Sequence, residues 1–169
     1  MNGIYGGGYQ GAIDKDTNIK LNGGTVNYIY GGGFEGNVIG NTVINIINGT
    51  IYENVYGGGY QGNVINNTDL NISNGNIQGS IYGGGYAGNI NGNVYIDYKD
   101  ALVETNIYGG GYEGDINTSN ITLNSGTVKG TVYGGGYAGD VLESVYIEEL
   151  GTTINESIYG GGYEGNVEK

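Results

Sequence analysis

The most constraining feature of this sequence is the string Ile-Tyr-Gly-Gly-Gly-Tyr-x-Gly, which occurs seven times in 169 residues with only Ile/Val and Tyr/Phe exchanges. A strict period predicts a repeat architecture, in which each unit buries its apolar face against its neighbours. We therefore expect residues 1–169 to form a single domain of seven repeats, the last of them partial. The copies lie 25 or 26 residues apart and start at Ile4, Ile29, Val55, Ile81, Ile107, Val132 and Ile158.

The segments between the motifs have the pattern of short β-strands. Stretches such as Thr42–Ile46 and Asn120–Asn124 alternate apolar and polar residues and are rich in β-branched side chains, and no segment has a helical period. Pairs such as Asn48-Gly49 and Asn74-Gly75 separate them and allow positive φ at turns. Five apolar positions recur in each repeat, and their second-repeat members are Ile29, Val38, Ile44, Ile46 and Ile51.

These columns predict an all-β fold, a single-stranded parallel β-helix (β-solenoid) of about six to seven coils of 25–26 residues. Coils stacked about 4.8 Å apart pair each strand with its copies above and below, so that the apolar columns face inward. One column contains Glu149 where the other repeats have Leu, Ile or Tyr. A Gly-rich polyproline II bundle is the structural alternative.

The motif tyrosines are the candidate binding residues. If Ile/Val points inward, strict alternation turns both aromatic positions outward, with a glycine between them. This predicts a groove with a bare backbone floor and two aromatic walls, suited to a linear glycan. The alternatives are purely structural stacking, self-association through the aromatic face, and the opposite parity, in which the tyrosines are core. The residues are Tyr5, Tyr9, Tyr30, Phe34, Tyr56, Tyr60, Tyr82, Tyr86, Tyr108, Tyr112, Tyr133, Tyr137, Tyr159 and Tyr163.

An Asn/Asp column follows each motif and predicts a ladder of side-chain hydrogen bonds along the stack. Its members are Asn37, Asn63, Asn89, Asp115, Asp140 and Asn166. Asp115 and Asp140 are also a weak calcium candidate, because Ca²⁺ takes several oxygen ligands. The structural interpretation is favoured, so no metal site and no cofactor is expected.

Composition excludes several function classes. Seventeen acidic residues against five lysines give a net charge of −12, which argues against a nucleic-acid partner. The chain contains no Cys or His, and a regular repeat offers no irregular catalytic constellation, so we expect no enzyme. Asp97, Asp100, Glu148 and Glu149 are interpreted as acidic residues on a solvated face. No long apolar run predicts membrane insertion.

The unit Gly23-Gly24-Thr25-Val26, followed by Ile29–Gly33 and by Glu35–Thr42, resembles a repeat of large Gly-rich adhesin-like surface proteins of Firmicutes and gut bacteria. Units of that family follow the pattern GGTVxxNVYGGGxxGxVxGNTxVxI, and the resemblance covers nearly the whole chain. It implies an extracellular, wall-associated β-helical stalk or adhesin without defined catalytic residues. No signal peptide begins the sequence, so we expect a fragment of a longer surface protein.

The sequence therefore predicts a non-enzymatic structural or adhesive β-solenoid segment of a bacterial surface protein. One alternative is a glycan-binding module that uses the tyrosine-walled groove. The other is a filament subunit that stacks end to end through uncapped solenoid ends, since exposed strand edges favour such pairing.

Overall fold

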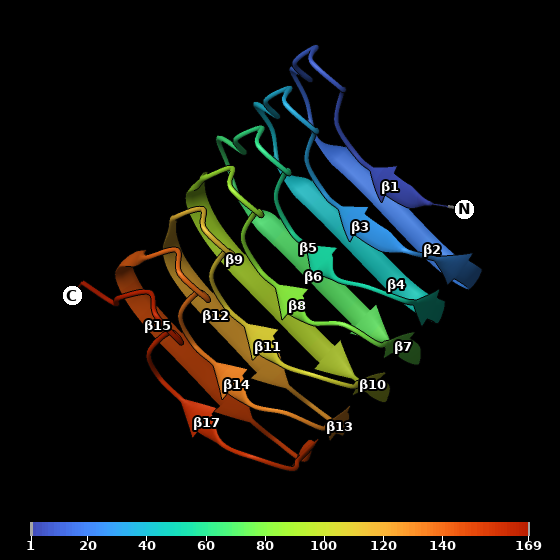
Figure 1. Ribbon diagram of the computed structural model, residues 1–169, viewed down its shortest axis with the longest axis vertical. Coiled ribbons are helices and arrows are strands. Elements are labelled where there is room, and N and C mark those ends of the chain that lie inside the picture. The colour runs from blue at the N-terminus through green and yellow to red at the C-terminus, as the bar shows by residue number, and fades with distance from the viewer. Residues whose placement is uncertain (1, 169) are drawn as a thin grey trace.

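The computed structural model, which describes residues 2–168, is an all-strand parallel β-solenoid of about six turns. The coils follow one another along the stack from the N-terminal to the C-terminal end (Figure 1). The predicted parallel β-helix is therefore confirmed.

The motif forms one face of the solenoid. Its Ile-Tyr pairs build a seven-stranded parallel sheet in which each strand lies beside its copy in the next coil. The register matches the motif copies, as in Ile29 with Val55 and Tyr30 with Tyr56. The strands, in order, are β1 (Gly3–Tyr5), β3 (Tyr28–Tyr30), β5 (Val55–Tyr56), β8 (Ile81–Tyr82), β11 (Ile107–Tyr108), β14 (Val132–Tyr133) and β17 (Ile158–Tyr159).

A ten-stranded parallel sheet forms the other face and consists of a long-strand and a short-strand column. The two columns join because β4 pairs with both β6 and β7. The long strands are β2 (Thr17–Val26), β4 (Thr42–Ile51), β6 (Thr68–Ser73), β9 (Ile90–Lys99), β12 (Ile116–Leu123) and β15 (Val141–Glu149). The short strands are β7 (Gly75–Ile77), β10 (Ala101–Val103), β13 (Gly126–Val128) and β16 (Thr153–Ile154).

All five predicted apolar columns line a single core between the two sheets. Their second-repeat members, Ile29, Val38, Ile44, Ile46 and Ile51, are fully buried. Tyr98 replaces an aliphatic residue in one column and is fully buried, and its hydroxyl donates to the carbonyl of Thr127 at 2.8 Å. Glu149 occupies the same column position in the sixth repeat, where it is exposed. Its carboxylate accepts from the backbone N–H of Gly151 at 2.7 Å.

The first 25-residue repeat is shorter in the connection between two strands, and the fifth is shorter inside the long strand β12. In the first repeat, two residues separate Val26 from Ile29, whereas three separate the paired Ile51 from Val55. In the fifth repeat, one residue separates the paired residues Ile116 and Thr118. In the preceding coil, two residues separate their partners Ile90 and Asn93. The core columns therefore keep their register.

Buried threonines connect the two faces. Thr17, Thr42 and Thr68 lie at the start of successive long strands, and their hydroxyls donate to the carbonyls of Gly31, Gly57 and Gly83 at 2.7–2.9 Å. Each acceptor is the first motif glycine of the following coil. These bonds hold the glycine segment of one coil against the sheet of the coil before it.

Most motif glycines inside the stack are required by close backbone approach, much of it between neighbouring coils. A Cβ on Gly62 would lie under 3.0 Å from the Gly36 carbonyl oxygen, which belongs to the rigid backbone of the preceding coil. At the predicted Asn48-Gly49 pair, Gly49 has φ 124° although β4 runs through it. At Asn74-Gly75 the positive φ falls on Asn74, at 53°.

This close approach predicts a strong difference between two identical substitutions at one motif position. Gly62→Ala should lower the free energy of unfolding by about 1–3 kcal/mol, the usual cost of overpacking. Gly11→Ala should change it by less than about 0.5 kcal/mol, because a Cβ there has no neighbour within 4 Å. Urea unfolding followed by circular dichroism measures both, and equal losses would contradict the proposed contact.

Candidate functional site

The first tyrosine of each motif lies in a continuous stack on the outer side of the motif sheet. Neighbouring rings, such as Tyr30 and Tyr56, are nearly parallel, and the centroids of successive rings are 4.6–5.5 Å apart. These tyrosines form an aromatic cluster of their own, while the adjacent Ile and Val residues belong to the aliphatic core. The first-row tyrosines therefore point outward, and the alternative in which they belong to the aliphatic core is not the one found.

The second aromatic row covers the first. Its rings are also stacked, at 4.8–5.0 Å, and each ring from Phe34 onward lies edge-to-face against the first-row ring of the preceding coil. For example, the centroids of Tyr30 and Tyr60 are 5.9 Å apart at an interplanar angle of 85°. This contact explains why Tyr30, Tyr56, Tyr82 and Tyr108 are buried although they point away from the core.

The predicted groove between the two rows is therefore wrong in its geometry. Edge-to-face contacts recur in successive coils at 5.8–6.0 Å, so the rings themselves fill the space that the walls were expected to enclose. The glycines expected to form an open floor, such as Gly32, Gly58 and Gly84, are buried. All fourteen candidate aromatics are brought together, but as one closed aromatic strip. Binding of a glycan to the outer surface of that strip stays a prediction.

The buried hydroxyls of the strip are held in the neutral state. Asn54 Nδ2 donates to the hydroxyl of Tyr56 at 3.0 Å, and Asn106 Nδ2 donates to that of Tyr108 at 3.1 Å. Burial nevertheless dominates, because it disfavours the phenolate, and it raises the pKa of both tyrosines to about 12. Tyr56 and Tyr108 thus offer no phenolate at neutral pH.

The Asn/Asp column forms the predicted ladder, with a different donor. The side-chain oxygen of each member accepts from the backbone N–H of the next member, as in Asn37 to Asn63 at 2.9 Å and Asn63 to Asn89 at 2.9 Å. At Asn166 the side-chain Nδ2 also donates to Asp140 Oδ1 at 3.2 Å, but the bond that recurs along the column needs only an acceptor oxygen. This explains why carboxylates can replace amides here, as Asp115 does when it accepts from the N–H of Asp140 at 2.9 Å.

Asp115 and Asp140 are fully accounted for by that ladder. Asp140 in turn accepts from the backbone N–H of Asn166 at 2.7 Å. Among residues 2–168, no three acidic side chains come together in a way that would hold a metal ion. The arrangement supports the structural interpretation of these two residues.

The other acidic candidates do not converge on one site. Asp100 accepts from Ser125 Oγ at 2.7 Å beside a turn, and Glu149 binds the backbone N–H groups of Gly151 and Thr152. Asp97 and Glu148 lie on the outer face of the ten-stranded sheet, where both pair in register with Thr122. Asp97 lines a depression on that face.

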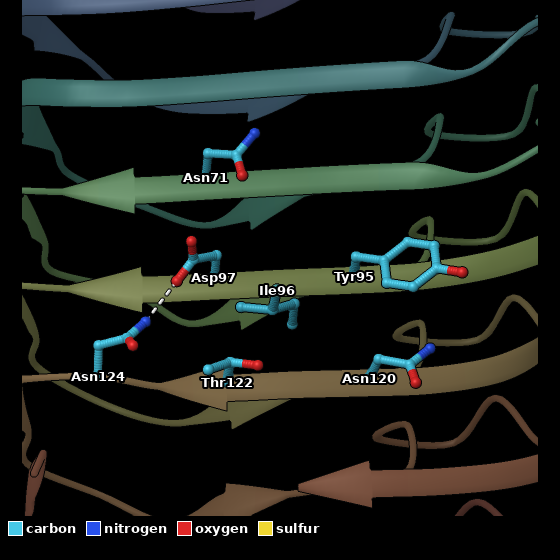
Figure 2. Close-up of a pocket in the computed structure, with 7 residues that line it drawn as sticks. All are labelled: Asn71, Tyr95, Ile96, Asp97, Asn120, Thr122 and Asn124. Carbon is cyan, nitrogen blue, oxygen red and sulfur yellow. Dashed lines mark hydrogen bonds between the residues drawn. The ribbon is translucent and has the colours of Figure 1, made fainter. Parts of the chain in front are cut away.

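Sequence reasoning missed that depression, a hollow of about 280 Å³ on the outer face of β6, β9 and β12 (Figure 2). Its members come from three successive coils, and the long strands bring them side by side. A signal in the sequence could have located it: Tyr95 and Asp97 occupy outward strand positions at which the neighbouring repeats have other, mostly polar residues. The lining residues are Asn71, Tyr95, Ile96, Asp97, Asn120, Thr122 and Asn124.

No protein-family model, curated protein or solved structure matches the chain. Across residues 2–168, no helix has the length and apolar character needed to cross a bilayer. The resemblance to adhesin-like repeats, the surface location and end-to-end stacking all stay predictions.

Burial of the tyrosine stack predicts a loss of stability in alkali. In unfolded chains tyrosine ionises near pH 10, whereas Tyr56 and Tyr108 in the fold ionise at about 12. The folded state therefore binds more protons in this window, and the free energy of unfolding should fall as the pH rises from about 10 to about 12. Chemical denaturation at several pH values measures the slope.

The double substitution Tyr56→Phe with Tyr108→Phe is the matched control, because Phe34 shows that a phenyl ring fits the strip. It should make the alkaline decline shallower while circular dichroism stays β-rich. An unchanged decline would show that these two hydroxyls do not cause it.

The ladder predicts that the acceptor at position 63 matters and its amide nitrogen does not. Asn63→Ala should destabilise the protein by about 1 kcal/mol, because it leaves the N–H of Asn89 without its acceptor. Asn63→Asp keeps an acceptor oxygen and should cost clearly less. Thermal unfolding of both variants separates the two cases, and equal losses would argue for the amide as a whole.

Proposed function

We propose that this chain is a non-enzymatic structural segment of a bacterial surface protein. In this proposal it is a rigid β-solenoid stalk that holds other parts of that protein at a fixed distance from one another. The observation that carries this proposal is that the most repeated residues all serve contacts between coils. The tyrosines stack on one another, the glycines permit close backbone approach, and the Asn/Asp column binds the next coil.

The geometry suits a stalk because every coil is bound to its neighbours by the same set of contacts. Parallel pairing, the aromatic stacks and the side-chain ladder all run along the solenoid axis. A structure with nearest-neighbour contacts gains length and stability with each added repeat. The resemblance of residues 23–42 to adhesin-like surface repeats supports the same role.

The acidic character fits an exposed rod. The net charge of −12 keeps rods apart by mutual repulsion, as high net charge generally does for soluble proteins. The described residues contain one salt bridge, between Lys129 and Glu104, which joins adjacent coils. Stability therefore comes from stacking and hydrogen bonding more than from ion pairs.

A coil deletion tests the stalk role. Removal of residues 55–80 takes out one complete repeat and places Ile81 over Ile29, so all columns remain in register. The protein should stay folded and become shorter by about 4.8 Å, one strand spacing, in small-angle X-ray scattering.

Deletion of residues 55–67 is the control, because it removes half a coil and brings unlike positions together. It should abolish the cooperative unfolding transition. If the complete-coil deletion also unfolds the protein, or if its length does not change, the modular stalk is refuted.

A further inference from the structure

We propose that the hollow on the outer face of β6, β9 and β12 is a carbohydrate-binding site for one or two uncharged sugar rings. The site is separate from the tyrosine strip and does not depend on the stalk role. Tyr95 provides the stacking surface, and Asp97 with its amide neighbours provides the hydrogen-bond acceptors.

Tyr95 differs from the motif tyrosines because no ring stacks on it. Its register partners in the adjacent coils are Asp69 and Asn120, and 41% of its surface is exposed. In Figure 2 the ring lies along β9 and turns a face outward. A free aromatic face of this kind can pack against the apolar C–H face of a sugar ring.

The polar groups of the hollow are held in place by neighbouring coils. The amide nitrogen of Asn71 donates to Asn45 Oδ1 at 3.2 Å, and that of Asn120 donates to the Val94 carbonyl at 3.2 Å. Asn124 Nδ2 donates to one carboxylate oxygen of Asp97 at 2.5 Å, the contact drawn in Figure 2. The side chains are thus fixed before a ligand arrives.

Each of these bonds uses an amide N–H and leaves the amide oxygen available as an acceptor. Within residues 2–168, no hydrogen bond engages Oδ1 of Asn71, Asn120 or Asn124, or the second carboxylate oxygen of Asp97. Unpaired oxygens of this kind accept from a ligand that carries several O–H donors. The hydroxyls of a sugar ring meet that requirement.

Charge and size narrow the ligand further. A single carboxylate, together with the net charge of −12, disfavours an anionic ligand and supplies too few charged oxygens for a calcium site. The volume of about 280 Å³ lies near the lower end of the ~300–1,000 Å³ range of ligand pockets. One or two rings fit, and a longer glycan would extend over the open sheet.

The floor of the hollow is rigid. Ile96 lines it from β9 with its side chain buried in the core. Tyr95, Asp97, Asn120 and Thr122 project from the two paired strands, β9 and β12. Sites built on strands keep their geometry better than sites on loops, so little ordering is needed on binding.

The test titrates the full chain with neutral mono- and disaccharides and, in parallel, with uronic acids, while amide NMR shifts are recorded. We expect neutral sugars to bind with a dissociation constant of ~1 mM, as weak small-ligand binding does, and to shift signals around Tyr95 and Asp97. Uronic acids should bind less tightly, and Asp97→Asn should reduce that difference.

Tyr95→Ala should weaken binding by roughly tenfold or more, as loss of a central aromatic anchor does. Tyr52→Ala, which removes another exposed tyrosine at a distant turn, is the matched control and should bind like the wild type. Asn71→Ala, a smaller change at the rim, provides a second folded variant and should weaken binding by a factor of about two to ten.

Three results would overturn the proposal. One is the absence of shifts around β9 at high sugar concentration. The second is unchanged affinity in both Tyr95→Ala and Asn71→Ala. The third is binding that maps to the tyrosine strip, for example one lost in Tyr86→Ala alone. None of these results affects the length change that tests the stalk.

Discussion

Parallel hydrogen bonding between coils at a strand spacing of about 4.8 Å governs the rest of this structure. At that spacing a residue is in direct contact with its equivalents in the coils above and below. Each column must therefore consist of side chains that can pack against, or bond to, identical side chains in the neighbouring coils. Aliphatic side chains interdigitate, aromatic rings stack, and amides bond in series. Glycine stands where backbones approach too closely for a Cβ, as at Gly62.

The aromatic strip follows from the same constraint. Two rows of rings repeat at the coil spacing, and each second-row ring meets the first-row ring of the coil before it, as Tyr60 meets Tyr30. Neighbouring coils are thus joined by ring stacking within each row and by edge-to-face contacts between the two rows. It acts as a second apolar layer outside the motif sheet, and this explains how short two-residue strands such as β5 and β8 remain in fixed register.

The sequence was sufficient to predict the solenoid, its five inward columns and the position of the Asn/Asp ladder, because each depends only on local alternation and on the repeat length. It did not predict that backbone N–H groups are the donors of that ladder. It could not predict the closed strip, because the tilt that brings Tyr60 against Tyr30 depends on how the glycine segment bends. Nor could it predict the hollow at Tyr95. That depression arises from side chains of three coils that the regular pattern does not specify.

The side-chain ladder gives the solenoid a direction. Asn37 offers its oxygen to the N–H of Asn63, and Asn63 offers its own to Asn89, always from the earlier coil to the later one. A finished coil therefore presents a row of acceptors before its successor exists. A chain synthesised from the N-terminus can add each new coil to one that is already in place, and each such step closes a loop of only one repeat.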